Sequence, residues 1–211
     1  MDDDGGNPMI EFAFHDLDYI PFGYGGTTAP YIETSGGTMR AAATLMCLGG
    51  DKVALTAGQE AATTVVCDLG CGDVIGLLSH INGLTKSIST ANGVGIDYNA
   101  ELINTAGINS KAAGVNAEWL IYDFNNDLDD LVDQLITTHQ VTHVFIYLVP
   151  KQLALETVRN ILTKLARSGV VLCCHKFFPL YLKPARRDVL MDLVVYDETS
   201  CEVVVSVALE T

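Results

Sequence analysis

Short apolar runs that are typical of buried strands alternate with amphipathic stretches that are typical of helices along most of the chain. The strand-like runs cover 64–68, 93–97, 118–123, 142–149 and 169–175, and helix-like stretches at 74–81, 100–113, 128–138 and 153–166 lie between them. Parallel strands need a long crossover connection, which is usually a helix. The alternation therefore predicts an α/β domain built on a largely parallel sheet.

The C-terminal part breaks this alternation. Residues 188–196 and 201–209 are both strand-like, and only Asp197 to Ser200 separate them. A connection of four residues is too short for a crossover. We therefore expect the two runs to pair as an antiparallel hairpin.

Composition limits the class of protein and of partner. The chain has 211 residues, of which 49% are hydrophobic and 18% are charged, a composition typical of a folded globular domain. Its 12 basic and 26 acidic residues give a net charge of −14, which repels phosphate backbones. Electrostatics therefore disfavours bulk binding of nucleic acid, although basic residues concentrate between Lys151 and Arg187 and leave a local basic patch as an alternative.

We expect two regions of different character. Residues 1–26 are rich in glycine and aspartate and are predicted to be an acidic, flexible segment. Residues 27–211 are predicted to form a single domain, which begins with a helical lead-in over 27–60. Thr34 or Ser35 is a suitable N-cap for the first helix of that lead-in.

The sequence also favours an intracellular setting. No apolar run reaches the roughly 18 residues that a membrane span needs, and no basic residue precedes Arg40, although signal and transit peptides carry early positive charge. The six cysteines contain no C-x-x-C pair, so we expect reduced thiols. These features predict a cytoplasmic protein, with the nucleus as an alternative.

The most specific motif is Val-Val-Cys-Asp-Leu-Gly-Cys-Gly-Asp at 65–73. Glycines at a strand-to-helix turn let a ligand approach the backbone closely. A dinucleotide fingerprint would place its third glycine at position 75, where Ile75 stands, so a nicotinamide-dependent oxidoreductase is disfavoured. The string Asp68-Leu-Gly-Cys-Gly72 resembles motif I of the class I S-adenosylmethionine-dependent methyltransferases.

This resemblance implies a fold and a cofactor. The fold is a Rossmann-like three-layer α/β/α sandwich, with a mostly parallel seven-stranded sheet and a C-terminal antiparallel hairpin, and the cofactor is S-adenosyl-L-methionine. Asp97 lies 97 − 68 = 29 residues after Asp68, where a carboxylate can accept both ribose hydroxyls. In the family, the acid at Asp123 or its neighbour contacts adenine. The chain departs from the pattern at Val74, where many members have a third glycine.

Together these positions form the predicted cofactor site: Asp68, Gly70, Cys71, Gly72, Asp97, Tyr98, Asp123, Phe124 and Tyr147.

A narrower resemblance concerns the methyl acceptor. The end of the fourth strand, Tyr147 to Pro150, and the stretches 29–35 and 174–179 resemble the small protein-lysine methyltransferases related to the ATP synthase c-subunit lysine methyltransferase. Glu33 stands where that group usually has proline. The resemblance implies a protein lysine as acceptor, with a small molecule as the alternative.

The acceptor wall predicted from this resemblance consists of Tyr147 as the catalytic candidate and the substrate-contacting lead-in residues Tyr31 and Thr34.

The sequence leaves other interpretations of the function and of single residues open. The Asp/Asn-Pro-Pro-Tyr string of amino-methylating families is absent, which leaves a non-catalytic interaction module with the same fold as an alternative. His175 ends the fifth strand, where a hydrogen-bonded or solvent-facing histidine is favoured over a general base. The histidines show no metal-ligand spacing, so no metal is expected.

Overall fold

The computed structural model describes residues 34–48, 64–71, 92–124 and 131–201. The helices and strands are α2 (Gly36–Leu45), β1 (Val65–Leu69), β2 (Asn92–Asp97), α4 (Ala100–Ala113), β3 (Ala117–Ile121), α5 (Leu131–Asp133), the π-helical turn η1 (Gln134–Thr138), β4 (His143–Ile146), α6 (Pro150–Leu153), α7 (Glu156–Arg167), β5 (Val171–His175), β6 (Arg186–Asp188), β7 (Leu193–Tyr196) and the 3-10 turn η2 (Glu198–Cys201).

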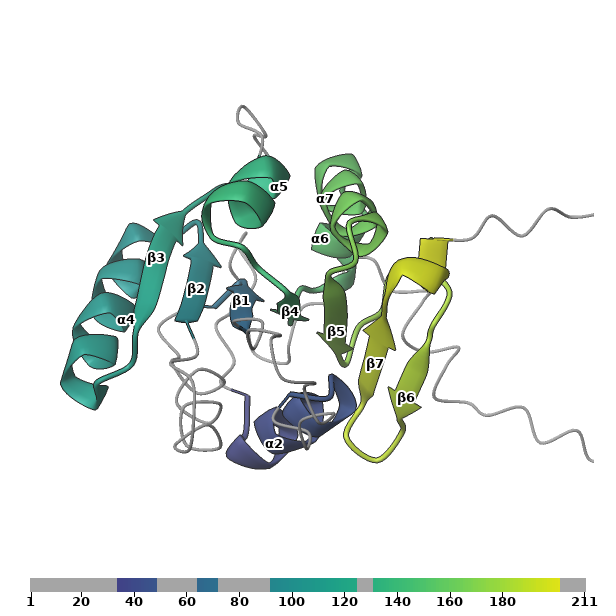
Figure 1. Ribbon diagram of the computed structural model, residues 1–211, viewed down its shortest axis with the longest axis horizontal. Helices are drawn as coiled ribbons and strands as arrows, with labels where there is room; N and C mark the ends of the chain where they lie inside the picture. Colours follow the sequence, from purple (N-terminus) through teal and green to yellow (C-terminus); the bar gives the residue numbers. More distant parts are fainter. Residues whose placement is uncertain (1–33, 49–63, 72–91, 125–130, 202–211) are drawn as a thin grey trace, which may run out of the picture.

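The strands form one seven-stranded sheet in the order β3-β2-β1-β4-β5-β7-β6 (Figure 1). Strands β1 to β5 pair in parallel, and β7 pairs antiparallel with both β5 and β6. The order reverses between β1 and β4, and in open α/β sheets ligands bind at such a switch point, outside the carboxyl ends of the strands. The predicted fold class, a mostly parallel sheet closed by an antiparallel hairpin, is confirmed.

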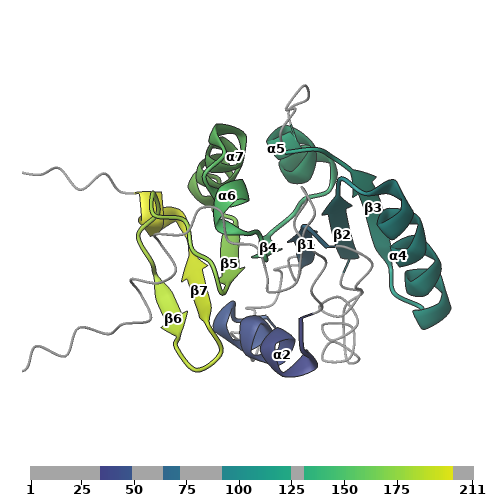
Figure 2. The same cartoon turned by 180° about the vertical axis from the view of Figure 1, so that it is seen from behind.

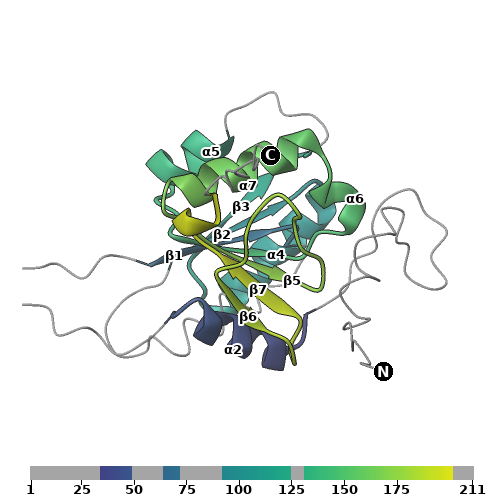
Figure 3. The same ribbon diagram turned by 90° about the vertical axis from the view of Figure 1, so that its right-hand side faces the viewer.

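Helices cover both faces of the sheet, as the views from behind and from the side show (Figures 2 and 3). On one face, α5 and α7 pack over Cys67, Ile146 and Leu172. On the other, α2 packs over Val66 and Phe145. Neighbouring residues of β1 therefore belong to opposite cores, as the two-residue period of a strand requires.

The helices follow from their sequence patterns. In α7, Val158, Ile161, Leu162 and Leu165 recur at helical spacing and are all buried. The N-cap of α4 is Asn99, whose side chain accepts from two backbone amides, and its C-cap is the left-handed Gly114. The cap of α2 is Ser35, one of the two residues predicted for it.

The predicted bounds of the terminal hairpin are wrong. Its strands are β6 and β7, and its turn, 189–192, lies inside the run predicted as its first strand. Residues 198–200 of the predicted turn instead belong to η2. Of the predicted second strand, only Cys201 is described, and it belongs to η2.

Several predictions fall outside the described residues. They are the segment 1–26, most of the lead-in 27–60, Tyr31, Gly72 and the helix at 74–81. All six cysteines are described, and all are free thiols. In the described parts of the chain, no helix has the length and apolar character to cross a membrane.

Candidate functional site

Two buried carboxylates meet at the carboxyl edge of the sheet. In the register of β1 and β2, Asp68 pairs with Gly95, which lies two residues before Asp97. Val66 belongs to the core on the α2 face and Ile96 to the opposite core, so the alternation of side chains places Asp68 and Asp97 together on the α2 face. Their exposed fractions are only 7% and 9%.

The protonation of Asp68 reflects this environment. Burial, and secondly the negative charge of Asp97, raise the pKa of Asp68 from 3.8 to about 7. Ionising two neighbouring carboxyl groups that are shielded from water costs free energy unless a positive charge lies near them. The pair is therefore suited to a ligand that brings a cationic group to Asp68.

The turn after β1 is tightly built. Gly70 has φ +80°, a conformation that L side chains rarely adopt, and its amide donates to the carbonyl of Ile96 at 2.8 Å. The amide of Cys71 donates to the same carbonyl at 3.0 Å. A Cβ atom at Gly70 would lie 3.0 Å from a methyl group of Leu148, a tight contact, so both the positive φ and the close packing favour glycine here.

The second carboxylate is held in place by its own loop. The backbone amide of Asn99 donates to Oδ1 of Asp97 at 2.9 Å, and the amide of Tyr122 donates to the carbonyl of Asp97 at 3.0 Å. Tyr98 follows with 48% of its surface exposed. The residues that follow β2 and β3 therefore fix one carboxylate oxygen and the backbone of Asp97.

Gly95 lies between the two carboxylates in the sheet, because it pairs with Asp68 and precedes Asp97 by two residues in β2. The backbone at Gly95 thus forms the floor of the site. A Cβ atom there would overlap the Trp119 ring and lie 3.1 Å from Sγ of Cys71. The indole Nε1 of Trp119 in turn donates to Oγ of Ser110 in α4 at 3.0 Å. The sequence analysis missed this role of Gly95, although a glycine inside a strand often marks a close approach of another group.

The predicted adenine contacts have different surroundings. Strand β3 ends at Ile121, so Asp123 lies two residues beyond the strand rather than at its end, and it is exposed. Phe124 is 7% exposed and packs in the core, with its ring against the edge of Tyr122 at 5.6 Å. Asp123 thus lies at the surface, whereas the Phe124 ring is occupied by packing.

An aromatic wall stands at the carboxyl ends of β4 and β5. The centroid of the Tyr147 ring lies 4.8 Å from that of the His175 ring and 6.4 Å from that of the Phe177 ring. The ammonium of Lys176 lies over the face of Tyr147, 5.7 Å from the ring centroid. The wall adjoins the glycine turn, since a Cβ atom at Gly70 would be 3.9 Å from the carbonyl oxygen of Tyr147.

The environment of His175 disfavours a general base. Burial and, secondly, the positive charge of Lys176 lower its pKa to about 4, so its imidazole is only a weak base. Its Nδ1 atom is buried and has no hydrogen-bond partner among the described residues. The side chain is therefore neither solvent-facing nor fully satisfied, and its ring packs against that of Tyr147.

Lys176 is a second residue that the sequence analysis missed. Its φ is +61°, and the amide of Phe177 donates to the carbonyl of His175 at 2.7 Å, which defines a strained γ-turn. The amide of Lys176 donates to the carbonyl of Asp192 in the hairpin turn. Lysine gives no sequence signal for a positive φ, so the pattern contained no indication of this turn.

The lead-in residue Thr34 lies directly before Ser35, the N-cap of α2. This helix packs over the face of the sheet that bears Asp68 and Tyr147.

Among the described residues, no group of histidine, cysteine or acidic side chains has an arrangement that could hold a metal ion.

No protein-family model and no curated protein matches the sequence. Solved structures do match. The human methyltransferase 10 domain containing protein aligns with a TM-score of 0.54 at 9% identity, over 80% of this chain and 84% of its own. The architecture is therefore the Rossmann-like fold of a methyltransferase.

Other structural neighbours are S-adenosylmethionine-dependent methyltransferases. One from Clostridium acetobutylicum has a TM-score of 0.42 at 12% identity and covers 66% of this chain and 48% of its own. PKMT2 from Rickettsia typhi, solved in complex with AdoHcy, has a TM-score of 0.41 at 16% identity and covers 69% of this chain and 26% of its own. The chain spans less than half the length of several proteins that it matches.

Proposed function

We propose that this chain binds S-adenosylmethionine and transfers its methyl group to an amine, with a protein lysine as the favoured acceptor. The observation that carries the proposal is the arrangement of Asp68, Gly70 and Asp97. Two buried carboxylates and a tightly packed glycine turn with a positive φ lie together at the switch point of the sheet. That is where an α/β sheet of this kind binds its ligand.

The residues fit the cofactor group by group. S-adenosylmethionine, when bound, supplies a methyl group on a positively charged sulfur. The carboxylate of Asp97 would accept the ribose hydroxyls, and Asp68 would accept from a cationic ammonium group. Such a group would stabilise the ionised form of Asp68, whose pKa is raised to about 7 in the structure without ligand.

The aromatic wall supports an amine as acceptor. Tyr147 stands beside the glycine turn, and the face of its ring already holds an ammonium group, that of Lys176. A ring face attracts cations through its quadrupole, so an incoming lysine side chain can be recognised in the same way. Before transfer the amine must lose its proton, and a desolvated site favours the neutral form.

Protein lysine is favoured over a small amine because the stretches 29–35, 147–150 and 174–179 resemble the small protein-lysine methyltransferases. We propose the cytoplasm, or else the nucleus, as the compartment. The alternative is a non-catalytic interaction module, which the absent Asp/Asn-Pro-Pro-Tyr string and Val74 in place of a glycine favour.

Calorimetric titration with S-adenosylmethionine and S-adenosylhomocysteine tests the cofactor site. The variant Asp97→Asn keeps an oxygen for the amide of Asn99 but removes the charge and one acceptor. We expect micromolar binding by the natural chain and a loss of about tenfold or more in Asp97→Asn, because a charge-assisted hydrogen bond contributes roughly 1.5–3 kcal/mol. Glu156→Gln, an exposed acid on α7, is the control and should bind normally.

The acceptor is tested with cofactor labelled in the methyl group. Label recovered as Nε-methyl-lysine after acid hydrolysis of a treated protein extract supports the lysine proposal, and label in small molecules supports the alternative acceptor. If the natural chain does not bind either compound at millimolar concentration, the enzyme proposal fails and the interaction module remains.

A further inference from the structure

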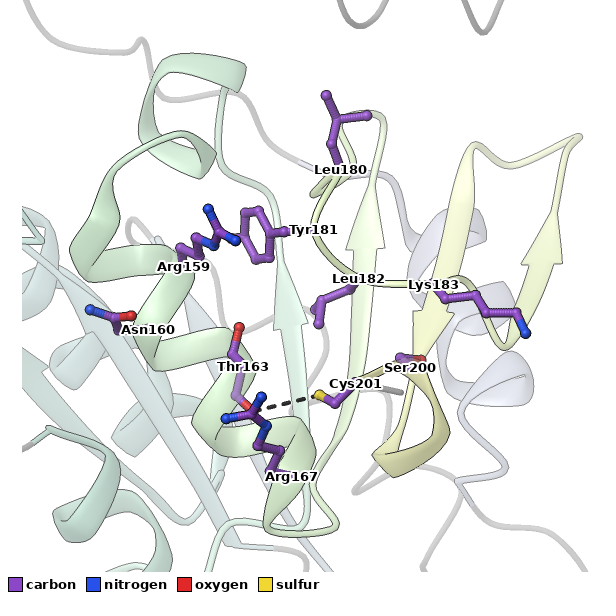
Figure 4. A pocket seen from close by; sticks show the side chains of 10 residues that line it. All are labelled: Arg159, Asn160, Thr163, Arg167, Leu180, Tyr181, Leu182, Lys183, Ser200 and Cys201. Carbon is purple, nitrogen blue, oxygen red and sulfur yellow. Dashed lines mark hydrogen bonds between the residues drawn. The ribbon is translucent and has the colours of Figure 1, made fainter. Parts of the chain in front are cut away.

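A groove of about 550 Å³ lies on the α7 face of the molecule, away from the Asp68–Asp97 pair. We call it the α7 groove, and α7, the segment 180–183 and η2 line it (Figure 4). Its lining residues include Arg159, Arg167 and Lys183 and, among the described residues, no acidic side chain. Three cations without an acid are unexpected in a chain with a net charge of −14.

Arg159 and Arg167 come from one face of α7. They are eight residues apart, with Thr163 midway, so successive members of the row are i,i+4 neighbours and the Cα atoms of the two arginines are separated by roughly 12 Å along the axis. Figure 4 shows all three on the side turned toward the groove, whereas the amine of Lys183 points away from α7. The groove is therefore flanked by two guanidinium groups with a hydroxyl between them.

Arg159 is ordered before any ligand arrives. Its guanidinium lies over the ring of Tyr181, 5.3 Å from the centroid, and the hydroxyl of Tyr181 donates to the carbonyl of Leu153 at 3.3 Å. A guanidinium that stacks on a ring still presents its N–H groups at its edge, where they can bind an oxyanion. Fixing the side chain in advance reduces the entropy lost on binding.

The opposite wall is also fixed. The thiol of Cys201 donates to the backbone carbonyl of Thr163 at 3.7 Å, which joins η2 to α7. The amide of Lys183 donates to the carbonyl of Ser200 at 3.0 Å, which joins the segment 180–183 to η2. The groove is thus bounded by elements that are bonded to each other.

We infer that the α7 groove binds a small oxyanion with at least two anionic groups, each held by one of the two arginines. The volume suits a small molecule, and guanidinium groups match both phosphate and carboxylate oxygens. A long polyanion is disfavoured because the rest of this acidic chain repels it. The inference does not depend on methyl transfer.

Titration of the full chain with pyrophosphate and with citrate, at matched ionic strength, tests the inference and separates the two oxyanion sources. We expect saturable binding of at least one of them, and a dissociation constant about tenfold higher in Arg159→Gln and in Arg167→Gln. Lys164→Gln is the matched control, because it removes the same charge from the same helix outside the groove. It should bind like the natural chain.

Three results would overturn the inference. They are no saturable binding of either probe at millimolar concentration, an equal loss of affinity in Lys164→Gln, and binding of poly-glutamate without binding of either small anion. Asp97→Asn should bind the small anion normally, and Arg167→Gln should bind S-adenosylmethionine normally. A failure of either site is thereby distinguished from a failure of the other.

Discussion

The ammonium of Lys176 lies over the face of Tyr147, 5.7 Å from the ring centroid, and a strained backbone holds it there. A positive φ at a residue other than glycine costs of order 1 kcal/mol or more, so it persists where surrounding contacts enforce it. Here the enforcing contacts are the γ-turn at 175–177 and the bond from the Lys176 amide to Asp192. The chain's own cation thus occupies the face on which we propose that the acceptor amine binds.

Removing that cation should open the ring face. In Lys176→Gln we expect n-butylammonium, which mimics a lysine side chain, to bind about two- to fivefold more tightly, since a cation–π contact contributes roughly 0.5–1 kcal/mol. Titration followed by NMR measures this affinity. The exposed Lys111→Gln on α4 serves as the control for a change of charge. Unchanged affinity in Lys176→Gln would show that the amine does not use this face.

The ring of Tyr147, rather than its hydroxyl, should recognise the amine. In a Lys176→Gln background, Tyr147→Phe should keep most of the affinity for n-butylammonium, and Tyr147→Leu should lose about fivefold or more because leucine has no π face. Both variants should bind S-adenosylhomocysteine with little change if Tyr147 acts mainly on the acceptor. An equal loss in the Phe and Leu variants would instead assign the role to the hydroxyl.

The buried acid pair should make stability depend on pH. The pKa of Asp68 is about 7 in the folded state and 3.8 for an ordinary aspartate, the value expected in the unfolded state. The folded state therefore binds the proton of the Asp68 carboxyl group more tightly than the unfolded state does. The contribution of Asp68 to the free energy of unfolding is therefore greatest below pH 4, falls as the pH rises from about 4 to 7, and is constant above. The full span corresponds to roughly 4 kcal/mol as an upper limit.

Asp68→Asn tests this assignment because it mimics the protonated acid at every pH. Urea denaturation at pH 5, 6, 7 and 8 should show that the variant gains stability relative to the natural chain as the pH rises, and that the gain levels off near pH 8. The same series with Glu156→Gln should show no such trend. A difference between Asp68→Asn and the natural chain that stays constant with pH would refute the raised pKa.

Burial patterns made much of the fold predictable from the sequence. Apolar residues recur in α7 with the helical period of 3.6, and largely apolar runs form β1 and β4. Both patterns indicate which side chains are buried, and this burial stabilises the elements in place. The motif at 65–73 likewise placed Asp68 at the end of a strand and Gly70 in the turn that follows it, because a glycine in such a turn marks a positive φ.

The sequence predicts an antiparallel hairpin but places its turn wrongly, because the tip of the turn between β6 and β7 is apolar. Val189, Leu190 and Met191 occupy its tip with exposed fractions of 64%, 94% and 41%, although apolar residues usually indicate a strand. The turn is formed instead by Asp188, whose Oδ1 accepts from the amides of Leu190 and Met191. The contacts of Tyr147 with Lys176 and of Gly95 with Trp119 were equally hidden, since each joins different strands or strand ends.

The contact between Gly95 and Trp119 leads to a prediction about stability that is independent of function. Gly95→Ala should lower the free energy of unfolding by about 2–4 kcal/mol, because the new Cβ would overlap the indole ring and β2 is buried on both sides. Gly107→Ala is the matched control, since its Cβ would lie 3.7 Å from the same indole, an ordinary contact. Within α4 this change should be neutral or stabilising by up to about 1 kcal/mol.

Urea denaturation of both variants and of the double variant Gly95→Ala with Trp119→Phe completes the test. The smaller ring leaves space for the methyl group, so the double variant should be less destabilised than the sum of the two single changes. Additive losses, or a Gly95→Ala variant as stable as Gly107→Ala, would show that the indole does not pack against the backbone of β2. In that case the floor beside Asp68 and Asp97 would be built differently from the one described.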